Sequence, residues 1–404
     1  MNSGDTAWLL TATALVLLMT LPALALFYGG LVQAKNVLSV LVQCFAVAAL
    51  ASVLWFAVGY SLVFSGTGNW IGDLKAAFLQ HAARGDLHPG TAIPESVYVM
   101  FQMTFAIITP ALIIGAYVER IRFSAVLLIS ALWLIIVYAP VAHWVWGGGW
   151  LAKMGTKDFA GGIVVHVTAG VSALVIAWML QPRNDFPHGI QPPHAPWMVM
   201  VGASLLWVGW FGFNAGSAIA SNGDAGMAML VTHLSAATAT IVWMAIEWIK
   251  FGKPSLVGAV TGTIAGLATI TPASGFVGPF GAIVLGSLSG IVCFYAVMIV
   301  KKAMKVDDAL DVLGVHGIGG ALGTLLLPFL VALGAGGTEL SMSVGDQFIA
   351  QAAGVGSVAI WSGLATFAIT KITALTIGLR VDRECETQGL DFTSHGETAY
   401  HTNR

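Results

Sequence analysis

Charged residues are scarce in this sequence: Asp, Glu, Lys and Arg make up 9% of its 404 residues, against about 25% in a soluble domain. Hydrophobic residues make up 57%. So few charged side chains cannot cover a water-facing surface. The composition therefore excludes an ordinary soluble protein and predicts one that lies in a membrane.

Two further shortages exclude classes of function. The 17 Lys and Arg against 19 Asp and Glu leave a formal charge of -2, so there is no basic surface for a nucleic-acid backbone and we expect no nucleic-acid partner. The three cysteines, Cys44, Cys293 and Cys385, are isolated and lack CxxC spacing. They predict neither a disulfide framework nor a zinc knuckle.

Long uncharged stretches can be used to count membrane spans, because a span needs about 20 apolar residues and a central charge costs at least ~2.5 kcal/mol. The stretch 254–300 is broken by the turn composition TPASG at 271–275 and should hold two spans. Nine other stretches hold one span each: 6–34, 36–72, 96–118, 123–152, 159–182, 186–223, 225–246, 312–338 and 347–370. The sequence therefore predicts an all-α polytopic membrane protein with eleven transmembrane helices.

The positions of Lys and Arg test this count, because basic residues gather in cytoplasmic loops. With the N-terminus outside, thirteen of the 17 fall inside, and a single span in 254–300 would leave six inside against eleven outside. We therefore predict the N-terminus outside and the C-terminus inside. The four outer residues are Lys75, Arg84, Lys153 and Lys157.

The ends of the chain raise two further points. The first span could be a cleaved signal, since Ala-Leu-Ala at 23–25 resembles a cleavage site, but no basic residue precedes it and we interpret it as a helix. The last residues are polar. We predict a membrane domain over residues 1–375 and a cytoplasmic tail over 376–404.

A repeat links two histidines. Val165-His166 and Val315-His316 are each followed by Gly four residues after the His, each is preceded by an Asp, at 158 and at 311, and the two copies lie 150 residues apart. They fall in the fifth and tenth spans, so the repeat unit is five helices and the second copy enters from the opposite face. This pattern is typical of inverted-repeat transporters, whose site lies near the midplane. The eleventh helix is then an extra one outside a 5+5 repeat.

Depth places both histidines in the middle of the membrane. At 1.5 Å per residue, His166 lies roughly 12 Å from Asp158 on the outer side and His316 roughly 13 Å from Asp307 on the inner side of a core ~30 Å thick. Each could simply pack between helices with a backbone partner. A metal site is disfavoured because no third His, Cys or carboxylate lies at that depth with helical spacing, so we expect no metal and no cofactor.

Aromatic residues form a second constellation in the outer half. Phe101 and Phe105 are i and i+4 in the third span, Trp146 follows the fourth, and Phe213 and Ser217 are i and i+4 at the outer end of the sixth. Aromatic faces attract a cation by about 0.5 to 2 kcal/mol and a Ser hydroxyl can accept its hydrogen bond. Taken singly, each aromatic residue also fits an interface belt or core packing.

With these residues in view, the chain resembles the ammonium transporters of the Amt/Mep/Rh family from its first helix to its tail. The resemblance is carried by several motifs in the family's order: FYGGL at 27–31, Glu119-Arg120, WGGG at 146–149, DFAGG at 158–162 through His166, WFGFNAGS at 210–217 and GVHG at 314–317. A Trp and a Ser at the cation site favour the bacterial Amt branch over the Rh branch.

The resemblance implies a role for each matching residue. Phe105, Trp146 and Ser217 would form an outer ammonium recruitment site, and Phe105 with Phe213 a stacked gate. His166 and His316 would be twin pore histidines. Asp158 would be a buried structural carboxylate. The remaining pore-lining positions implied are Phe101, Tyr138, Trp210 and Thr271.

The resemblance also implies binding partners and a cellular location. The family is trimeric with one pore in each subunit, so a homotrimer in the cytoplasmic (inner) membrane is implied, in contact with membrane lipids. The tail resembles the regulatory segment that couples subunits and meets PII-type signal proteins in bacterial members.

The resemblance also implies the function, which would be ammonium uptake and not an enzymatic reaction. We expect ammonium to bind outside, to lose a proton at or below the gate, and to cross as ammonia, with or without the proton, through a hydrophobic pore, because moving a bare cation through such a pore costs many kcal/mol. Two alternatives stay open: an ammonium sensor and an Rh-like neutral gas channel. An enzyme would need a nucleophile or metal beside the histidines, and the sequence offers none.

Overall fold

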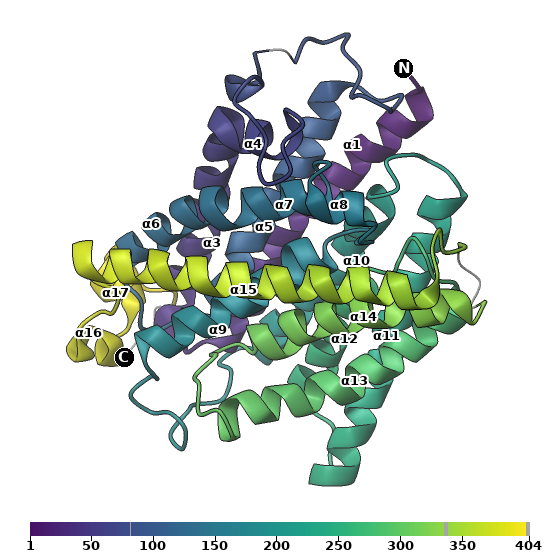
Figure 1. Ribbon diagram of the computed structural model, residues 1–404. Helices are drawn as coiled ribbons and strands as arrows, with labels where there is room; N and C mark the ends of the chain where they lie inside the picture. The colour runs from purple at the N-terminus through teal and green to yellow at the C-terminus, as the bar shows by residue number, and fades with distance from the viewer. Residues whose placement is uncertain (81, 335–337, 401–404) are drawn as a thin grey trace.

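The computed structural model describes residues 1–80, 82–334 and 338–400. In those ranges the chain forms α-helices joined by loops and short π-helical or 3-10 turns, without a β-strand, which confirms the predicted all-α class (Figure 1). The helices of the N-terminal part are α1 (Ser3–Leu18), α2 (Ala25–Leu31), α3 (Val37–Leu54), α4 (Tyr60–Phe64), α5 (Glu95–Tyr117), α6 (Phe123–Trp133), α7 (Ala139–Val145), α8 (Trp150–Met154) and α9 (Thr168–Leu180). The remaining helices are α10 (Pro196–Gly216), α11 (Gly223–Phe251), α12 (Leu256–Ile270), α13 (Pro279–Lys302), α14 (Ile318–Ala332), α15 (Val344–Thr376), α16 (Arg383–Gln388) and α17 (Leu390–His395).

Ten helical stretches of the described residues are long and apolar enough to cross a membrane, and α12 is a shorter apolar helix of 15 residues. The predicted division of 254–300 is confirmed, because α12 ends at Ile270 and α13 begins at Pro279. Several spans join two helices through a π-helical turn, as at Met19–Leu24 between α1 and α2. The total of eleven spans and the predicted orientation stay predictions.

Glycine lets the first span pack closely against α10. A Cβ added at Gly202 would lie 2.3 Å from the backbone nitrogen of Phe27, and one at Gly212 would lie 2.7 Å from the carbonyl oxygen of Ala12. Close approach of this kind is how small residues stabilise helix pairs in membranes. The first span is thus a packed helix of the bundle.

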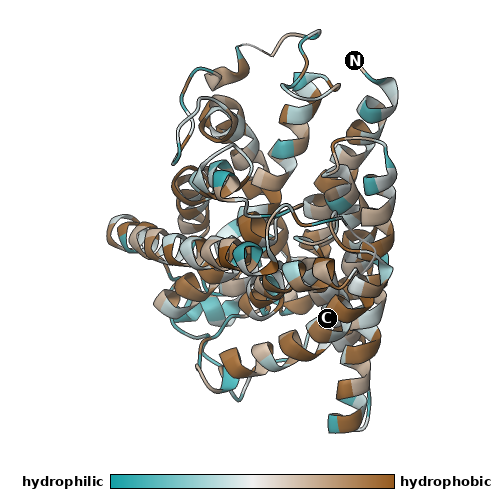
Figure 2. Cartoon of the chain, turned by 45° about the vertical axis from the view of Figure 1, so that its right-hand side comes forward, coloured by the Kyte–Doolittle hydropathy of each residue, from teal (hydrophilic) through white to brown (hydrophobic). Residues whose placement is uncertain are grey.

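The helix α15 lies across the outside of the bundle, where it packs on α6, α9 and α14 (Figure 1). Its position fits the prediction of one helix outside the repeat. Hydrophobic residues predominate along the helices (Figure 2), and many large ones are exposed, among them Ile241, Phe280 and Leu364. A bundle with an apolar exterior is suited to lipid or to a neighbouring subunit.

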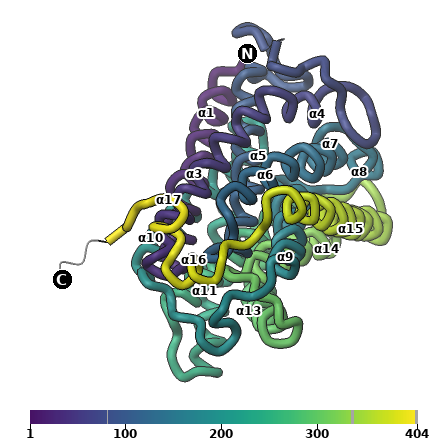
Figure 3. The backbone as a smooth tube through the Cα atoms, turned by 90° about the vertical axis from the view of Figure 1, so that its left-hand side faces the viewer, coloured from purple at the N-terminus to yellow at the C-terminus, as the bar shows by residue number. Residues whose placement is uncertain are grey.

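We name the end of the bundle that carries the N-terminus the outer end, following the orientation predicted from the charges. The end of α10 lies there too, because the Trp8 indole donates to the carbonyl of Ala215 and Ser221 N–H donates to Asp5. The tail folds back against the bundle (Figure 3): α17 packs on α3, and Glu386 of α16 accepts from the N–H of Asn184.

Candidate functional site

A cavity of about 270 Å³ opens at the outer end. Phe105 from α5, Trp146 at the end of α7 and Ser217 at the end of α10 all line it, so the structure brings the three predicted recruitment residues together. Its other lining residues are Tyr98, Gln102, Val145, Phe159 and Ile219.

Local contacts fix the groups that face this cavity. The Trp146 indole donates to the backbone carbonyl of Asp158 at 2.9 Å, and its ring stands edge-on to Phe105 with centroids 5.7 Å apart. The Ser217 hydroxyl donates to the carbonyl of Phe213 at 2.8 Å, which leaves its oxygen lone pairs free to accept. The cavity therefore combines aromatic rings with a hydrogen-bond acceptor, which suits a small cation.

Two phenyl rings close the bottom of the outer cavity. Phe105 and Phe213 are buried, their ring centroids lie 4.4 Å apart, and the planes are inclined by 34°. Phe213 also lines a second cavity of about 10 Å³ on the other side. The predicted gate pair thus separates two cavities.

The histidine pair lines this small second cavity. The Nδ1 atoms of His166 and His316 lie 3.2 Å apart, and the rings are nearly parallel at 21° with centroids 5.2 Å apart. In two neutral imidazoles, one Nδ1 must donate this hydrogen bond and the other must accept it. The donating ring then has no hydrogen on Nε2, whereas the accepting ring carries its hydrogen there. Since His166 Nε2 has no partner in the described part of the chain, the pair can exchange a hydrogen bond with a solute.

Two glycines let the repeat segments cross at the histidines. A Cβ at Gly170 would lie 2.4 Å from the Cα of Gly317, and one at Gly320 would lie 2.5 Å from the carbonyl of Gly162 and 2.7 Å from the Cβ of His166. Early residues of one segment meet late residues of the other, so the segments run in opposite directions. This antiparallel crossing is the geometry that the predicted inverted repeat requires.

Carboxylates cap the start of both repeat segments. Asp158 accepts four backbone N–H bonds, from Gly161, Gly162, Ile163 and Val164, at 2.6 to 3.0 Å. These bonds satisfy donors that a helix start leaves open.

The carboxylate matched to Asp158 in the second copy differs from the one that the sequence suggested. Asp308, 150 residues after Asp158, accepts from Leu313 N–H at 2.8 Å, as Asp158 accepts from Ile163. Asp311 is instead 2.6 Å from the ammonium group of Lys301. Asp308 is therefore the counterpart of Asp158, since each lies eight residues before its histidine, and the pairing of Asp158 with Asp311, which lies only five residues before His316, is wrong.

The four predicted lining residues have different surroundings. Trp210 lines the small cavity with its ring stacked 5.6 Å from His166, and its indole donates to the Thr271 hydroxyl at 2.9 Å. Thr271 therefore holds Trp210. Phe101 stands edge-on to Phe105 at 5.1 Å. Tyr138 packs 6.3 Å from Trp133 and 6.4 Å from Trp55 in an aromatic cluster and lines neither the outer cavity nor the small one.

A third cavity, of about 210 Å³, opens beyond the histidines towards the inner end. It shares Phe27, Ile264 and His316 with the small cavity, so the two adjoin. Its polar lining includes Glu119, Lys301 and Asp311. Sequence reasoning missed this polar mouth, and it also missed Gln102, although a Gln three residues before Phe105 in an apolar helix was a usable signal.

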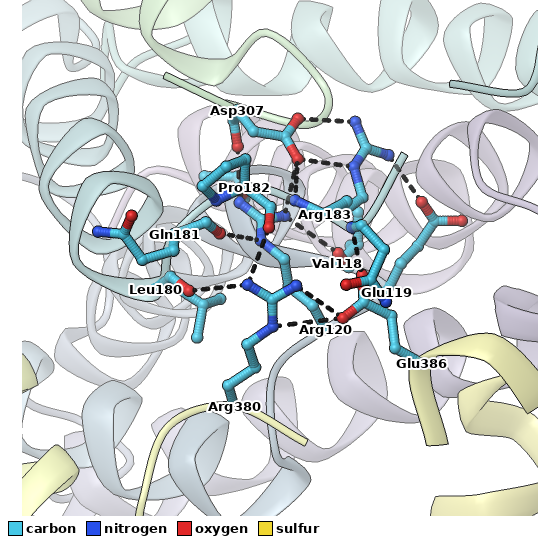
Figure 4. A network of polar contacts seen from close by, with 12 residues as sticks. Val118, Glu119, Arg120, Leu180, Gln181, Pro182, Arg183, Asp307, Arg380 and Glu386 are labelled. Carbon is cyan, nitrogen blue, oxygen red and sulfur yellow. Dashed lines mark hydrogen bonds and ion pairs between the residues drawn. The ribbon is translucent and has the colours of Figure 1, made fainter. Parts of the chain in front are cut away.

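A network of ion pairs surrounds the inner mouth (Figure 4). Arg183 donates to both carboxyl oxygens of Asp307, at 2.8 and 2.9 Å, and to Glu119 at 2.7 Å. Burial acts to raise the pKa of Asp307, but the hydrogen bonds and charge of Arg183 and the charge of Arg120 outweigh it and hold that pKa below its ordinary value. The ionised side chains of this network therefore join three loops, which carry Glu119, Arg183 and Asp307.

The tail completes this inner end. Arg380 donates to Glu386 at 2.7 Å, and the Asp391 carboxylate accepts from the N–H groups of Leu38 and Ser39, at 3.0 and 2.8 Å. A tail carboxylate thus caps the start of α3. The Lys35 ammonium also donates to the carbonyl of Thr387 at 2.6 Å.

Comparison with known proteins agrees with this architecture. The sequence model of the Ammonium Transporter Family matches residues 7–400. The chain is 45% identical to a putative ammonium transporter of Methanothermobacter thermautotrophicus over 405 residues, covering 99% of each chain. It is also 45% identical to an ammonium transporter of Bacillus subtilis over 403 residues, with the same coverage.

Solved structures share the fold. A protein described as Sensor Amt Protein superposes with a TM-score of 0.90 at 29% identity, covering 98% of each chain. Mep2 of Saccharomyces cerevisiae superposes with a TM-score of 0.86 at 33% identity, covering 95% of this chain and 91% of its own.

Proposed function

The chain belongs to the ammonium transporter family, and we propose that it takes up ammonium across the cytoplasmic membrane by recruiting the cation at the outer cavity and conducting ammonia past the histidine pair. One observation carries this proposal. A buried imidazole pair lines the small cavity, which adjoins the inner cavity and is separated from the outer one by the contacting rings of Phe105 and Phe213.

The outer cavity suits recruitment of a cation. Trp146 and Phe105 present aromatic surface, and the Ser217 oxygen can accept a hydrogen bond. Neither a carboxylate nor a metal is needed, since the quadrupoles of aromatic rings attract ammonium.

Passage beyond the gate favours the neutral form. The small cavity is lined mainly by apolar side chains together with the two imidazoles. Removing the water around a permanent cation there costs many kcal/mol, whereas removing the water around neutral ammonia costs far less. An imidazole can accept or pass a proton near neutral pH. Ammonium therefore gives up its proton at or below the gate, and ammonia crosses with the proton following along the pair or returning.

The Trp146→Leu variant tests the outer site. Loss of one cation–π contact of about 1 to 2 kcal/mol raises the apparent KM for ammonium roughly fivefold to thirtyfold, while flux at saturating ammonium stays within about a factor of two. The measurement is initial ammonium uptake by proteoliposomes over a range of concentrations.

The matched control for this test is Trp197→Leu. Trp197 is exposed near the start of α10 and lines none of the three cavities described above. Its replacement leaves both parameters unchanged. Complete loss of flux in a folded Trp146→Leu protein would contradict recruitment.

The assembly and its regulation complete the proposal. The apolar exterior is compatible with a homotrimer in lipid, with one pore in each subunit. The cytoplasmic tail then regulates flux and meets a PII-type signal protein. Support for regulation comes from the contacts of Arg380 and Asp391, which tie the tail to the inner ends of the spans.

Truncation tests the role of the tail. Deletion of residues 388–404 removes Asp391 from the start of α3, and we expect flux to fall or to lose its regulation while the ratio of ammonium to potassium transport is unchanged. Asp391→Asn should reproduce part of the effect. Glu384→Gln, which changes an exposed residue of α16, should not. A changed ion ratio on truncation would place the selectivity partly in the tail.

A further inference from the structure

A polar cluster lies beside the outer cavity, apart from the groups used so far. The Nδ1 atom of His88 is 2.7 Å from one carboxyl oxygen of Glu95, and the Tyr60 hydroxyl donates to the other. The His88 and Glu95 side chains are 16% and 17% exposed. The loop that carries His88 is fixed by backbone bonds from His88 to Ile93 and from Glu95 to Asp86. The pair is thus ordered and within reach of external protons.

A chain of contacts connects this pair to the cavity. The His88 ring stacks on Tyr98 with centroids 3.5 Å apart and planes within 12°. The Tyr98 hydroxyl accepts from the side-chain amide of Gln102 at 3.4 Å. Tyr98 and Gln102 both line the outer cavity, and the buried Gln102 Oε1 has no partner in the described part of the chain. That oxygen is a second acceptor, beside Ser217, for a bound cation.

The charge of the cluster depends on one side chain. Histidine ordinarily changes charge between about pH 5 and 8. With His88 neutral, the Glu95 carboxylate leaves the rim with one negative charge. With His88 charged, that negative charge is cancelled and a cation lies against the face of Tyr98. The groups that face His88 are Glu95 and Tyr98 of α5 with Tyr60 and Phe64 of α4.

We propose that His88 and Glu95 are a proton-sensitive positioning pair for the outer cavity, which binds ammonium more tightly when His88 is neutral than when it is charged. The inference rests on the proposed function and adds external pH as a control of affinity. Neither residue touches the pore, so the pair acts on recruitment and leaves conduction alone.

The test is ammonium uptake by cells of a host without ammonium transporters, at external pH from about 8 to about 5.5, with apparent KM and maximal rate measured separately. The wild-type KM for ammonium rises roughly threefold to fivefold as pH falls. This is the effect that one added charge on His88 has on a cation ~10 Å away at an effective dielectric constant of about 40. The maximal-rate profile is the same in wild type and in the variants of this pair. Ammonium itself stays protonated over this range.

Three variants separate charge from structure. His88→Gln keeps a low KM at every pH, because the Glu95 charge is never cancelled. Glu95→Gln raises KM at about pH 8 by a similar factor, and the double variant has a raised KM without pH dependence. His188→Gln, an exposed histidine in the loop between α9 and α10, is the control and follows the wild type.

Each outcome bears on a distinct claim. A His88→Gln protein that keeps the wild-type dependence of KM on pH overturns the inference, as does an unchanged KM in Glu95→Gln if His88→Gln fails to assemble. A wild type that takes up no ammonium at any pH contradicts the proposed function instead.

Discussion

Replacing His166 by Asp should open the pore to potassium. The imidazole of His166 lies beside the small apolar cavity, with Trp210 and Phe213 against it. A fixed negative charge about 5 Å from a passing cation is worth roughly 3 kcal/mol at an effective dielectric constant of 20. Potassium flux through His166→Asp should therefore rise about a hundredfold over the wild type, measured as potassium uptake by proteoliposomes under a potassium gradient.

His166→Asn is the matched control, because it has nearly the same size as Asp and carries no charge. It should stay closed to potassium. The double variant His166→Ala/His316→Ala should lose proton-coupled current, since nothing then relays a proton across the cavity. Equal potassium flux through the Asn and Asp variants would mean that added space, and not charge, admits the cation.

Replacing Asp158 by Ala should damage the outer half of the protein more than any single aromatic substitution. The carboxylate is buried and accepts four backbone N–H bonds at the start of the fifth span. Unsatisfied buried donors cost about 1 to 3 kcal/mol. Because the Asp158 carbonyl also holds the Trp146 indole, we expect a lower melting temperature together with a raised KM for ammonium.

Asp158→Asn keeps one acceptor oxygen and should recover part of both losses. The measurements are thermal unfolding in detergent and initial uptake by proteoliposomes, on protein of matched purity. An Asp158→Ala protein with wild-type melting temperature and wild-type KM would show that the carboxylate has no structural role.

The spans were predictable because charge is expensive in a bilayer and therefore marks the loops. The helix break at 271–275 followed from turn residues alone, and the shared midplane depth of His166 and His316 followed from the repeat and from their spacing to Asp158 and Asp307. These predictions needed only position along the chain. The structure places the two imidazoles in direct contact, and the glycines that allow this were already visible in the repeat.

The features that could not be predicted from the sequence depend on how a helix is rotated about its axis and on contacts between loops far apart in the chain. Three Asp residues, at 307, 308 and 311, precede His316, and only the backbone path shows which one caps the helix start and which two form ion pairs. Gln102 looked like one polar residue among apolar neighbours. The sequence carried no signal for the pairing of Arg183 with both Asp307 and Glu119.

The most direct test of the account is ammonium flux through the wild-type protein in proteoliposomes, with potassium as the competing cation. Ammonium and potassium are similar in size, but only ammonium can lose a proton. We expect ammonium uptake that a large excess of potassium leaves unchanged in maximal rate, with no potassium uptake of its own. Equal currents carried by potassium and ammonium would contradict the account, because the histidines would then be packing residues in a cation channel.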